Sequence, residues 1–478
     1  MEMESKQELA ERLGCHGQEH LLQFWDELDE AGRDLLAKEI ASIDFDQLDR
    51  LIAGLVRGAV EEPEIPAERV HPIDVVRLPQ TDGERTARRR ATDAGEEALA
   101  AGEVGVVLVA GGSGTRLGFP GPKGTFPIGP VSSASLFQIH AEKLVALGSR
   151  YGKQPPLYVM TSPENHDATV EFFERNGRFG LDHVRFFIQG RMPAVDLKTG
   201  KILLAARDRL AMSPDGHGGT LAALAGPGDA GCEPSCLAEM GERGVQTLFY
   251  FQVDNPMVEI ADPTFIGLHR QGQAEMSFKV VEKMTPDEKV GVVVLVDGRP
   301  QVIEYSDLPR SLAEKRGEEG QLAYWAGSIA IHAFERSFIE RLVGGLRLPF
   351  HRAVKKVPYV LPTGETVQPA EPNAVKFEQF IFDALPAAER FVIVETDRAV
   401  EFEPLKNAVG PDSPATVHQR MSDLFGGWLE QAGVVVPRRP DGSVPFAIEI
   451  SPLFALAAHD LRAKVEPGLV VERPLYLR

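Results

Sequence analysis

The chain has 478 residues, 43% of them hydrophobic and 25% charged, which favours an ordinary soluble globular protein of two or three domains. Its net charge of -19 argues against a general nucleic-acid binder but not against a nucleotide site, because nearby Arg and Lys side chains set the field in a cleft. The 3 cysteines are too few for a disulfide framework, and no apolar run approaches the ~20 residues of a membrane span, so a cytoplasmic protein is expected.

Residues 5–57 are predicted to form a helical subdomain, because their apolar side chains recur at helical spacing. Asp44 is expected to cap a helix that runs through Leu51. Residues 61–90 are rich in proline and charge and are predicted to connect this subdomain to a helix near 91–102.

Residues 104–124, VGVVLVAGGSGTRLGFPGPKG, carry the clearest functional signal. An apolar strand over 104–109 runs directly into a glycine-rich loop. Glycines let backbone N–H groups approach phosphate oxygens, and Arg116 and Lys123 add positive charge. The pattern predicts a polyphosphate site whose glycines are Gly111, Gly112 and Gly114.

Two common phosphate-binding templates do not fit this loop. The glycines give GxGxxxG rather than the GxGxxG of a dinucleotide fingerprint, which disfavours a Rossmann oxidoreductase. The order around Lys123 is also not the GxxxxGK followed by Ser or Thr of the phosphate-binding NTPases.

Alternating strands and helices are predicted after the loop, at 136–147, 157–161, 164–176 and 184–188. Such alternation indicates an α/β sheet with its ligand beyond the carboxyl ends of the strands. Gln189 follows the last of these strands, and its carboxamide suits a nucleobase edge. His217 lies in a glycine-dense turn at 213–219, where a ligand contact and a simple capping role are equally favoured.

An acidic residue, Asp254, follows the apolar strand predicted at 247–253. A carboxylate in this position suits Mg²⁺, and we prefer that role to a simple turn. A hairpin over 290–304 is predicted to bring Glu304 to a sugar, while Lys406 follows a strand at 391–394. Residues 410–478 alternate short apolar runs with turns, which predicts a small β-rich domain.

Motifs along nearly the whole chain follow one order: GQEHLLQFWDELDEA, LVAGGSGTRLG, PKGTFPIG, LFQIHAEK, VMTS, SPDGHGG, VDNP, VVEK, VIEYSD, EFEPLKNA and EISPL. In this order they resemble those of the UDP-N-acetylhexosamine and UDP-sugar pyrophosphorylases, which are uridylyltransferases. The resemblance implies an α/β, Rossmann-like (GT-A-like) mixed sheet flanked by helices. The predicted domains are a helical subdomain with its linker at 1–95, a catalytic domain at 96–390 and a C-terminal domain at 391–478.

The resemblance also implies a role for each candidate residue. The UTP phosphates would contact Gly111, Gly112, Gly114 and Arg116. Lys123 and Lys406 would lie at the reacting phosphates, Gln189 and Gly216 at the uracil, and Asp254 at Mg²⁺. The sugar would contact His217, Glu304, Trp325, Ser328, Phe380 and Phe382. The implied substrates are UTP and a sugar 1-phosphate, with neither nucleic acid nor membrane as a partner.

The sugar is the part of this prediction with an open alternative. Where eukaryotic N-acetylglucosamine enzymes of the family have the sequence NAGN, this chain has Trp325, Ala326, Gly327 and Ser328, and His217 replaces an Asn. N-acetylglucosamine 1-phosphate is the expected sugar substrate, and the alternatives are glucose 1-phosphate or the broad range of sugars that a general UDP-sugar pyrophosphorylase accepts. A non-catalytic nucleotide-sugar sensor on the same fold is disfavoured, because it predicts loss of cationic and acidic residues that are all present.

Overall fold

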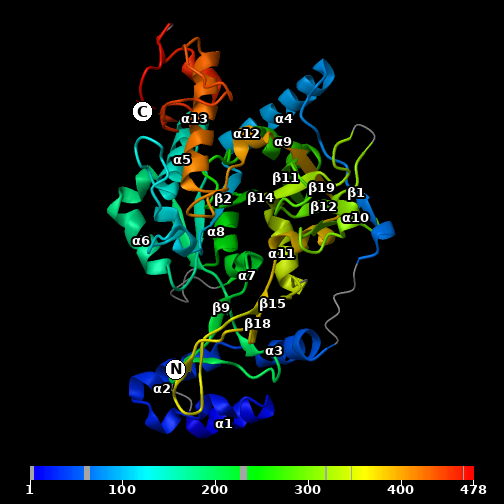
Figure 1. The fold of residues 1–478 in the computed structure, drawn as a ribbon, viewed down its shortest axis with the longest axis vertical. Helices are drawn as coiled ribbons and strands as arrows, with labels where there is room; N and C mark the ends of the chain where they lie inside the picture. Colours follow the sequence, from blue (N-terminus) through cyan, green and yellow to red (C-terminus); the bar gives the residue numbers. More distant parts are fainter. Residues whose placement is uncertain (1–4, 59–64, 227–233, 318–319, 346, 467) are drawn as a thin grey trace. The chain divides into compact units, whose positions relative to one another are not determined.

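The computed structural model describes residues 5–58, 65–226, 234–317, 320–345, 347–466 and 468–478. The chain divides into two compact units that alternate along the sequence (Figure 1). Unit 1 contains Met1–Glu64, Gln189–Ala222 and Arg347–Asp383, and unit 2 contains Ile65–Ile188, Ala223–Leu346 and Ala384–Arg478. The three consecutive domains stay a prediction. Cys232 and the start of the expected linker, 61–64, lie outside the described residues.

The predicted helical subdomain is present at the start of unit 1 as α1 (Lys6–Cys15), α2 (Glu30–Ala41) and α3 (Phe45–Leu51). Asp44 caps α3 as predicted, because its carboxylate accepts a hydrogen bond of 2.9 Å from the backbone N–H of Gln47. Trp25 is buried in the core that these helices share with the strands of unit 1.

The strands of unit 1 form small sheets. A three-stranded sheet has the order β15-β18-β6, and the other strands pair as β5 with β9, β7 with β8 and β16 with β17. Their bounds are β5 (Arg191–Pro193), β6 (Val195–Asp196), β7 (Leu204–Ala206), β8 (Arg209–Leu210), β9 (Met212–Pro214), β15 (His351–Lys355), β16 (Tyr359–Val360), β17 (Thr366–Val367) and β18 (Ala374–Glu378).

Unit 2 is built on a ten-stranded mixed sheet with the order β1-β12-β14-β10-β2-β3-β4, in which β13 pairs with β12 and β11 pairs with β14 and β19. Strands β10, β2, β3 and β4 are parallel, so their carboxyl ends share one edge. The bounds are β1 (Val70–Pro72), β2 (Val104–Val109), β3 (Leu157–Thr161), β4 (Val184–Ile188), β10 (Thr247–Gln252), β11 (Met276–Glu282), β12 (Val292–Val296), β13 (Arg299–Ile303), β14 (Ala326–Glu335) and β19 (Phe391–Glu395).

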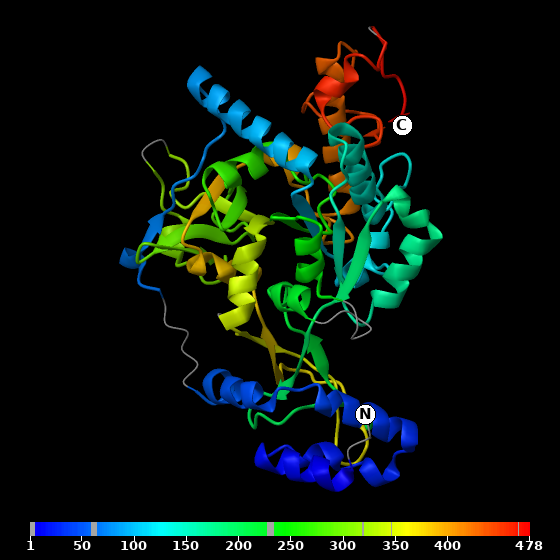
Figure 2. The same ribbon diagram turned by 180° about the vertical axis from the view of Figure 1, so that it is seen from behind.

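Helices flank this sheet, and the two helices between its first strands lie close to the ranges predicted from the sequence. The bounds are α4 (Asp82–Ala101), α5 (Leu136–Tyr151), α6 (His166–Arg175), α8 (Cys236–Glu242), α9 (Pro263–Gln271), α10 (Arg310–Ala313), α11 (Arg336–Gly345), α12 (Arg398–Glu401) and α13 (Pro414–Gln431). Helix α7 (Gly219–Ala225) crosses the boundary between the units in sequence. Figures 1 and 2 both show α13 beside α5.

Two sequence predictions in unit 2 are wrong. Helix α4 begins at Asp82 rather than near 91, because Thr81 and Glu84 form a capping box at its start. The segment 410–478 is not β-rich: it contains the 18-residue helix α13 and only the short strands β20 (Ile448–Ile450) and β21 (Leu475–Leu477). The buried Val417, Met421 and Leu429 recur at helical spacing that the short apolar runs obscured.

None of the helices in the described residues is long and apolar enough to span a membrane. The side chain of Cys15 is exposed, and that of Cys236 is buried.

Candidate functional site

The glycine-rich loop (residues 110–124) leaves the carboxyl end of β2 and folds back on itself. The backbone N–H of Lys123 donates to the carbonyl of Gly112 at 3.1 Å. The side-chain amide of Asn165, at the start of α6, donates to the carbonyl of Ala110 at 2.9 Å. These bonds fix the loop at both ends, as a site made of backbone N–H groups requires.

Residues 111–118 form the outer part of this loop. Gly114 is buried against Phe119, and a Cβ at Gly114 would lie 2.8 Å from that ring, so only glycine fits. Gly111 is half-buried and Gly112 is exposed. The side chain of Arg116 is exposed and has no hydrogen-bond partner among the described residues, which leaves its guanidinium available to an anion.

Lys123 and Asp254 meet at the edge of the sheet. Lys123 Nζ lies 3.1 Å from Asp254 Oδ2, and the two side chains are only 12% and 14% exposed. The contact follows from the topology, because β10 lies beside β2 in parallel with Gln252 opposite Val109. The segments that follow β2 and β10, which contain Lys123 and Asp254, therefore leave the sheet at the same edge.

Lys406 joins this pair through the backbone. The N–H of Leu405 donates to the carbonyl of Asp254 at 2.8 Å, and the N–H of Lys406 donates to the carbonyl of Asp412 at 2.7 Å. Burial raises the pKa of Asp412, an effect that the charge of Lys406 opposes. We call Lys123, Asp254 and Lys406, together with the glycine-rich loop, the charged group.

A buried cation that the sequence analysis missed lies behind the charged group. Lys279 is 2% exposed and its Nζ lies 2.7 Å from Glu401 and 2.8 Å from Asp262. Burial lowers the pKa of Lys279, but these carboxylates more than offset it, so the pKa is raised. Asn255 Nδ2 donates to the carbonyl of Glu401 at 2.8 Å. The segments that carry Asp254 and Lys406 are thereby tied together.

Glu304 and Ser328 also lie near each other in unit 2. The backbone N–H of Ser328 donates to the carbonyl of Gly291 at 2.8 Å. A Cβ built on Gly291 would lie 3.2 Å from Glu304 Oε1. The strands β12, β13 and β14 thus bring the Glu304 carboxylate and the backbone of Ser328 close to the same residue, Gly291.

Trp325 already has a partner within the protein. The guanidinium carbon of Arg77 lies 4.0 Å from the centroid of its indole ring, and Arg77 Nε lies 2.8 Å from Glu395. The backbone carbonyl of Trp325 accepts from the N–H of Lys283 at 2.9 Å. Lys283 is buried, and burial lowers the pKa of its amine. A buried lysine just after β11, in the motif VVEK, was the signal that the sequence analysis passed over.

In unit 1, Gln189 and Gly216 lie together with Asp215. Gln189 Nε2 donates to the carbonyl of Gly216 at 2.7 Å and to Asp215 Oδ1 at 3.2 Å. Gly216 has a φ of 85°, and a Cβ would collide with the backbone of Gln379. Burial raises the pKa of Asp215 to about 6. We call Gln189, Asp215 and Gly216 the amide group.

His217 packs against Phe380 and Phe382, with ring centroids 5.5 Å and 5.7 Å apart. His217 Nδ1 accepts a hydrogen bond of 3.1 Å from the backbone N–H of Ile381, which leaves the proton on Nε2. Burial lowers the pKa of His217 to about 4, so the ring is neutral at pH 7. Unit 1 therefore offers a neutral aromatic surface.

The predicted residues thus fall into two sets. Unit 2 brings together Lys123, Asp254 and Lys406, and separately Glu304 and Ser328. Unit 1 brings Gln189 to Gly216, and His217 to Phe380 and Phe382. Asp215, Asn255, Lys279 and Lys283 were not predicted.

Comparison with known proteins decides the family. The sequence model described as UTP-glucose-1-phosphate uridylyltransferase matches residues 49–425. The chain belongs to this uridylyltransferase family. The human UDP-N-acetylhexosamine pyrophosphorylase-like protein 1 is 38% identical to this chain, covering 99% of it and 97% of the human protein. The UDP-N-acetylglucosamine pyrophosphorylase of Saccharomyces cerevisiae is 33% identical, covering 96% and 98%.

Solved structures of relatives support the same assignment. The uridine diphosphate N-acetylglucosamine pyrophosphorylase from Trypanosoma brucei superimposes with a TM-score of 0.82 at 27% identity, covering 99% of each chain. The putative UDP-N-acetylglucosamine pyrophosphorylase from Entamoeba histolytica has a TM-score of 0.74 at 32% identity, covering 86% of this chain and 100% of that one. The uridylyltransferase therefore has the mixed α/β fold expected from its sequence.

Proposed function

We propose that this uridylyltransferase joins UTP to N-acetylglucosamine 1-phosphate, forming UDP-N-acetylglucosamine and pyrophosphate. The observation that carries the proposal is the meeting of Lys123, Asp254 and the Lys406 segment beside the glycine-rich loop. The sugar is taken from relatives that are named for UDP-N-acetylhexosamine or UDP-N-acetylglucosamine.

The reaction needs positive charge and alignment. A phosphate oxygen of the sugar 1-phosphate attacks the α-phosphorus of UTP, and the bond from that phosphorus to the oxygen bridging to the β-phosphate breaks as pyrophosphate leaves. The nucleophile is already an anion, so no general base is required. Lys123, Lys406 and Arg116 offset the repulsion between the two anionic substrates, and the loop N–H groups align the triphosphate.

The charged group fits a magnesium ion that is held jointly by protein and substrate. Asp254 is a carboxylate at a strand end, and Lys123 occupies only its Oδ2. Among the described residues no cluster of three His, Cys, Asp or Glu side chains is arranged to bind a metal. Mg²⁺ commonly binds through one or two protein carboxylates together with substrate phosphates, so a single carboxylate such as Asp254 is compatible with it. Bound there, Mg²⁺ would neutralise phosphate charge.

Glucose 1-phosphate is the second candidate sugar substrate. The description of the matching family, UTP-glucose-1-phosphate uridylyltransferase, names this sugar phosphate. Trp325, with Arg77 stacked on its ring, and Ser328 stand where the family resemblance leads us to expect two asparagines. An indole in this position takes up volume that an acetamido group would need. Glu304 is proposed to bind the sugar hydroxyls of either substrate.

The roles proposed for unit 1 follow its chemistry. Gln189 retains a free carbonyl oxygen in the described structure, and we assign it and Gly216 to the uracil. His217, Phe380 and Phe382 offer ring faces and one N–H donor, and we assign them to the sugar.

Pyrophosphate release tests the proposal. Purified protein is incubated with UTP, Mg²⁺ and a panel of sugar 1-phosphates that includes N-acetylglucosamine, N-acetylgalactosamine and glucose. We expect the highest kcat/KM with N-acetylglucosamine 1-phosphate and loss of most turnover in Lys406→Ala. A preference for glucose 1-phosphate would support the second candidate, and no release with any sugar would overturn both.

A further inference from the structure

Lys283, the residue that directly follows β11, is a buried lysine to which the reaction above assigns no role. It is only 3% exposed. Within the parts of the chain that the structure describes, its Nζ has no hydrogen-bond or ion-pair partner, and its small exposed area includes the amine, because Nζ is not one of the fully enclosed polar atoms. An amine that water barely reaches is unfavourable without a partner. Lys283 therefore lacks a partner that a ligand can supply.

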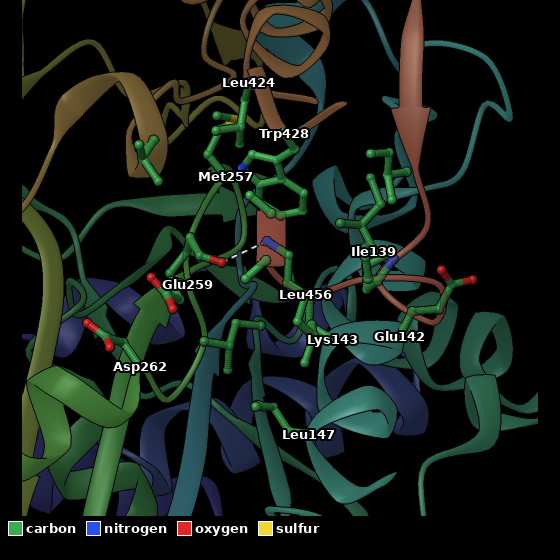
Figure 3. Close-up of a pocket in the computed structure, with 18 of the residues that line it drawn as sticks. Ile139, Glu142, Lys143, Leu147, Met257, Glu259, Asp262, Leu424, Trp428 and Leu456 are labelled. Carbon is green, nitrogen blue, oxygen red and sulfur yellow. Dashed lines mark hydrogen bonds between the residues drawn. The ribbon is translucent and has the colours of Figure 1, made fainter. Parts of the chain in front are cut away.

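Two other lysines of unit 2 with shielded amines do have partners. Lys279 Nζ lies 2.7 Å and 2.8 Å from two carboxylates. Lys143, which lines the cavity between α5 and α13, donates to two backbone carbonyls at 2.6 Å and 2.7 Å (Figure 3). Lys283 differs from both, because its amine has no such contact in the described structure.

Two carboxylates act on the charge of Lys283, but neither pairs with it. Glu288 accepts from Arg398 Nη2 at 2.6 Å and from the backbone N–H of Met284 at 2.7 Å. Asp287 is exposed to solvent. Burial lowers the pKa of the Lys283 amine, and the charges of Glu288 and Asp287 only partly oppose this effect. These acidic groups therefore leave the amine unsatisfied.

The sheet topology places Lys283 at the edge that carries the charged group. Strands β10 and β11 both run antiparallel to β14, so they are parallel to each other and end at one edge. Asp254 comes shortly after β10, and Lys283 directly after β11. The guanidinium of Arg398, in α12, donates to the carbonyl of Glu282 at 3.2 Å. This bond ties the end of β11 to the segment that leads to Lys406.

The backbone of Lys283 is bonded to the strand that carries residues assigned to the sugar. Its N–H donates to the carbonyl of Trp325 at 2.9 Å. Val280, three residues earlier, lies opposite Ser328 in the register of β11 and β14. Lys283 thus adjoins both the sugar residues and the edge where we propose that the phosphates react. The substrate group that belongs in both places is the phosphate of the sugar 1-phosphate.

We propose that Lys283 binds the phosphate of the sugar 1-phosphate and is thus a further substrate-binding residue of the reaction. This inference rests on the proposed function. A lysine amine offers three N–H donors and a compact charge to an anion, and it transfers no proton in this role. A sugar hydroxyl is the weaker candidate, because a neutral partner leaves a poorly solvated charge uncompensated. Lys283 would hold the phosphate in place and offset part of its repulsion from UTP.

Steady-state pyrophosphate release tests the assignment with Lys283→Met, which keeps most of the length of the side chain and removes the amine. We expect the KM for the sugar 1-phosphate to rise at least about tenfold at saturating UTP, a loss of about 1.4 kcal/mol, while the KM for UTP stays within about twofold. Lys289→Met, at an exposed position of the same segment, is the matched control and should equal the parent. An unchanged KM for the sugar 1-phosphate, or a rise confined to UTP, would overturn the proposal.

Calorimetry without turnover separates this inference from the proposed function. The β-phosphate of the product UDP-N-acetylglucosamine is the phosphate that the sugar contributes, and UMP lacks it; UDP-glucose replaces this product if the sugar panel selects glucose. Lys283→Met should weaken binding of the UDP-sugar at least about tenfold and leave binding of UMP unchanged. If the parent binds both ligands, equal weakening of both, or of neither, would overturn the assignment of Lys283 alone. A parent that neither binds them nor releases pyrophosphate would overturn the proposed function, and this inference with it.

Thermal unfolding of the ligand-free protein distinguishes a substrate-binding lysine from a structural one. Removal of an unpaired, poorly solvated amine should leave the melting temperature of Lys283→Met equal to or above that of the parent. Removal of an amine with a charged partner inside the protein should lower it. A melting temperature clearly below that of the parent, or a variant that does not fold, would show that the lysine is structural and would overturn the proposal.

Discussion

The charged group of unit 2 and the amide group of unit 1 differ in how protein charge is used. Lys123 and Asp254 form an ion pair, and the glycine-rich loop that contains Lys123 also contains the exposed Arg116. In unit 1 burial works against charge, raising the pKa of Asp215 to about 6 and lowering that of His217 to about 4. Charge suits the joining of two anions, whereas neutral donors and rings suit a base or a sugar.

This contrast predicts where substitutions affect the chemical step and where they affect binding. In the charged group they should lower kcat, because the charge matters most as the α-phosphorus changes partners. In unit 1 they should raise KM, because hydrogen bonds to a base are equally strong before and during reaction. The predictions below run from the largest expected effect to the smallest.

Lys123→Ala is expected to lower kcat about a hundredfold or more, equivalent to about 3 kcal/mol, because it removes a buried charge from the place where we propose that the phosphates react. Steady-state pyrophosphate release measures it. Lys198→Ala, in an exposed turn of unit 1, is the control and should match the parent. If both variants have parental kcat, the charged group is not the reacting centre.

Asp254→Asn is expected to lower kcat about tenfold to a hundredfold and to raise the Mg²⁺ concentration for half-maximal activity, because the amide is a poorer ligand for a hard cation. A magnesium titration at saturating UTP measures both effects. An unchanged magnesium requirement would contradict the assignment of Asp254 to the metal even if kcat fell.

Gln189→Ala is expected to raise the KM for UTP about tenfold, the loss of about 1.4 kcal/mol, with little change in kcat. Because Gln189 also bonds the carbonyl of Gly216, thermal unfolding must be compared with the parent. Gln189→Glu should give the same KM defect if the amide donors are needed. A fall in kcat at unchanged KM would break the contrast between the units.

Asp215→Asn tests the neutral state of the amide group. The folded pKa of Asp215 is about 6 against 3.8 in the unfolded chain, so the folded state binds more protons between these values. Its contribution to stability is therefore complete below about pH 4 and falls as the pH rises through 6. We expect the melting temperature of the variant minus that of the parent to increase from pH 4.5 to pH 7, because only the parent loses stability as Asp215 ionises. A constant difference would show that Asp215 is not perturbed.

Trp325→Asn is expected to have the smallest effect, a change of about threefold to tenfold in the ratio of kcat/KM for N-acetylglucosamine 1-phosphate over glucose 1-phosphate. The asparagine is smaller than the indole and adds an amide at the position that we propose contacts the sugar. The ratio is measured with both sugars in one mixture. Arg77→Gln, which removes the cation stacked on the ring together with its ion pair to Glu395, is the matched control for altered packing around Trp325.

The strand and loop framework of unit 2 was predictable because local signals agreed. The apolar runs at 104–109, 157–161 and 184–188 match β2, β3 and β4 residue for residue. The contact between Lys123 and Asp254, 131 positions apart, followed from two parallel strands ending at one edge. The roles of these residues stay predictions.

Other features depended on context that the pattern did not carry. The helical spacing of the apolar residues in α13 was overlooked, because the prediction for 410–478 was made from the short apolar runs that follow this helix. Asp215 and Lys283 matter through their burial, which a single residue within a loop or at a strand end does not reveal. The division into two units was missed because unit 1 is assembled from three separate segments.

The buried Lys279 has a consequence for exchanging parts between relatives. Its ammonium forms ion pairs with both Asp262 and Glu401. Replacing one of the three residues alone would leave an unpaired charge in the interior and lower the free energy of unfolding by about 3–5 kcal/mol. A chimera that imports residues 401–406 from another uridylyltransferase must therefore import matching residues at 262 and 279. We expect these three positions to tolerate exchange only as a set, although the chain separates them widely.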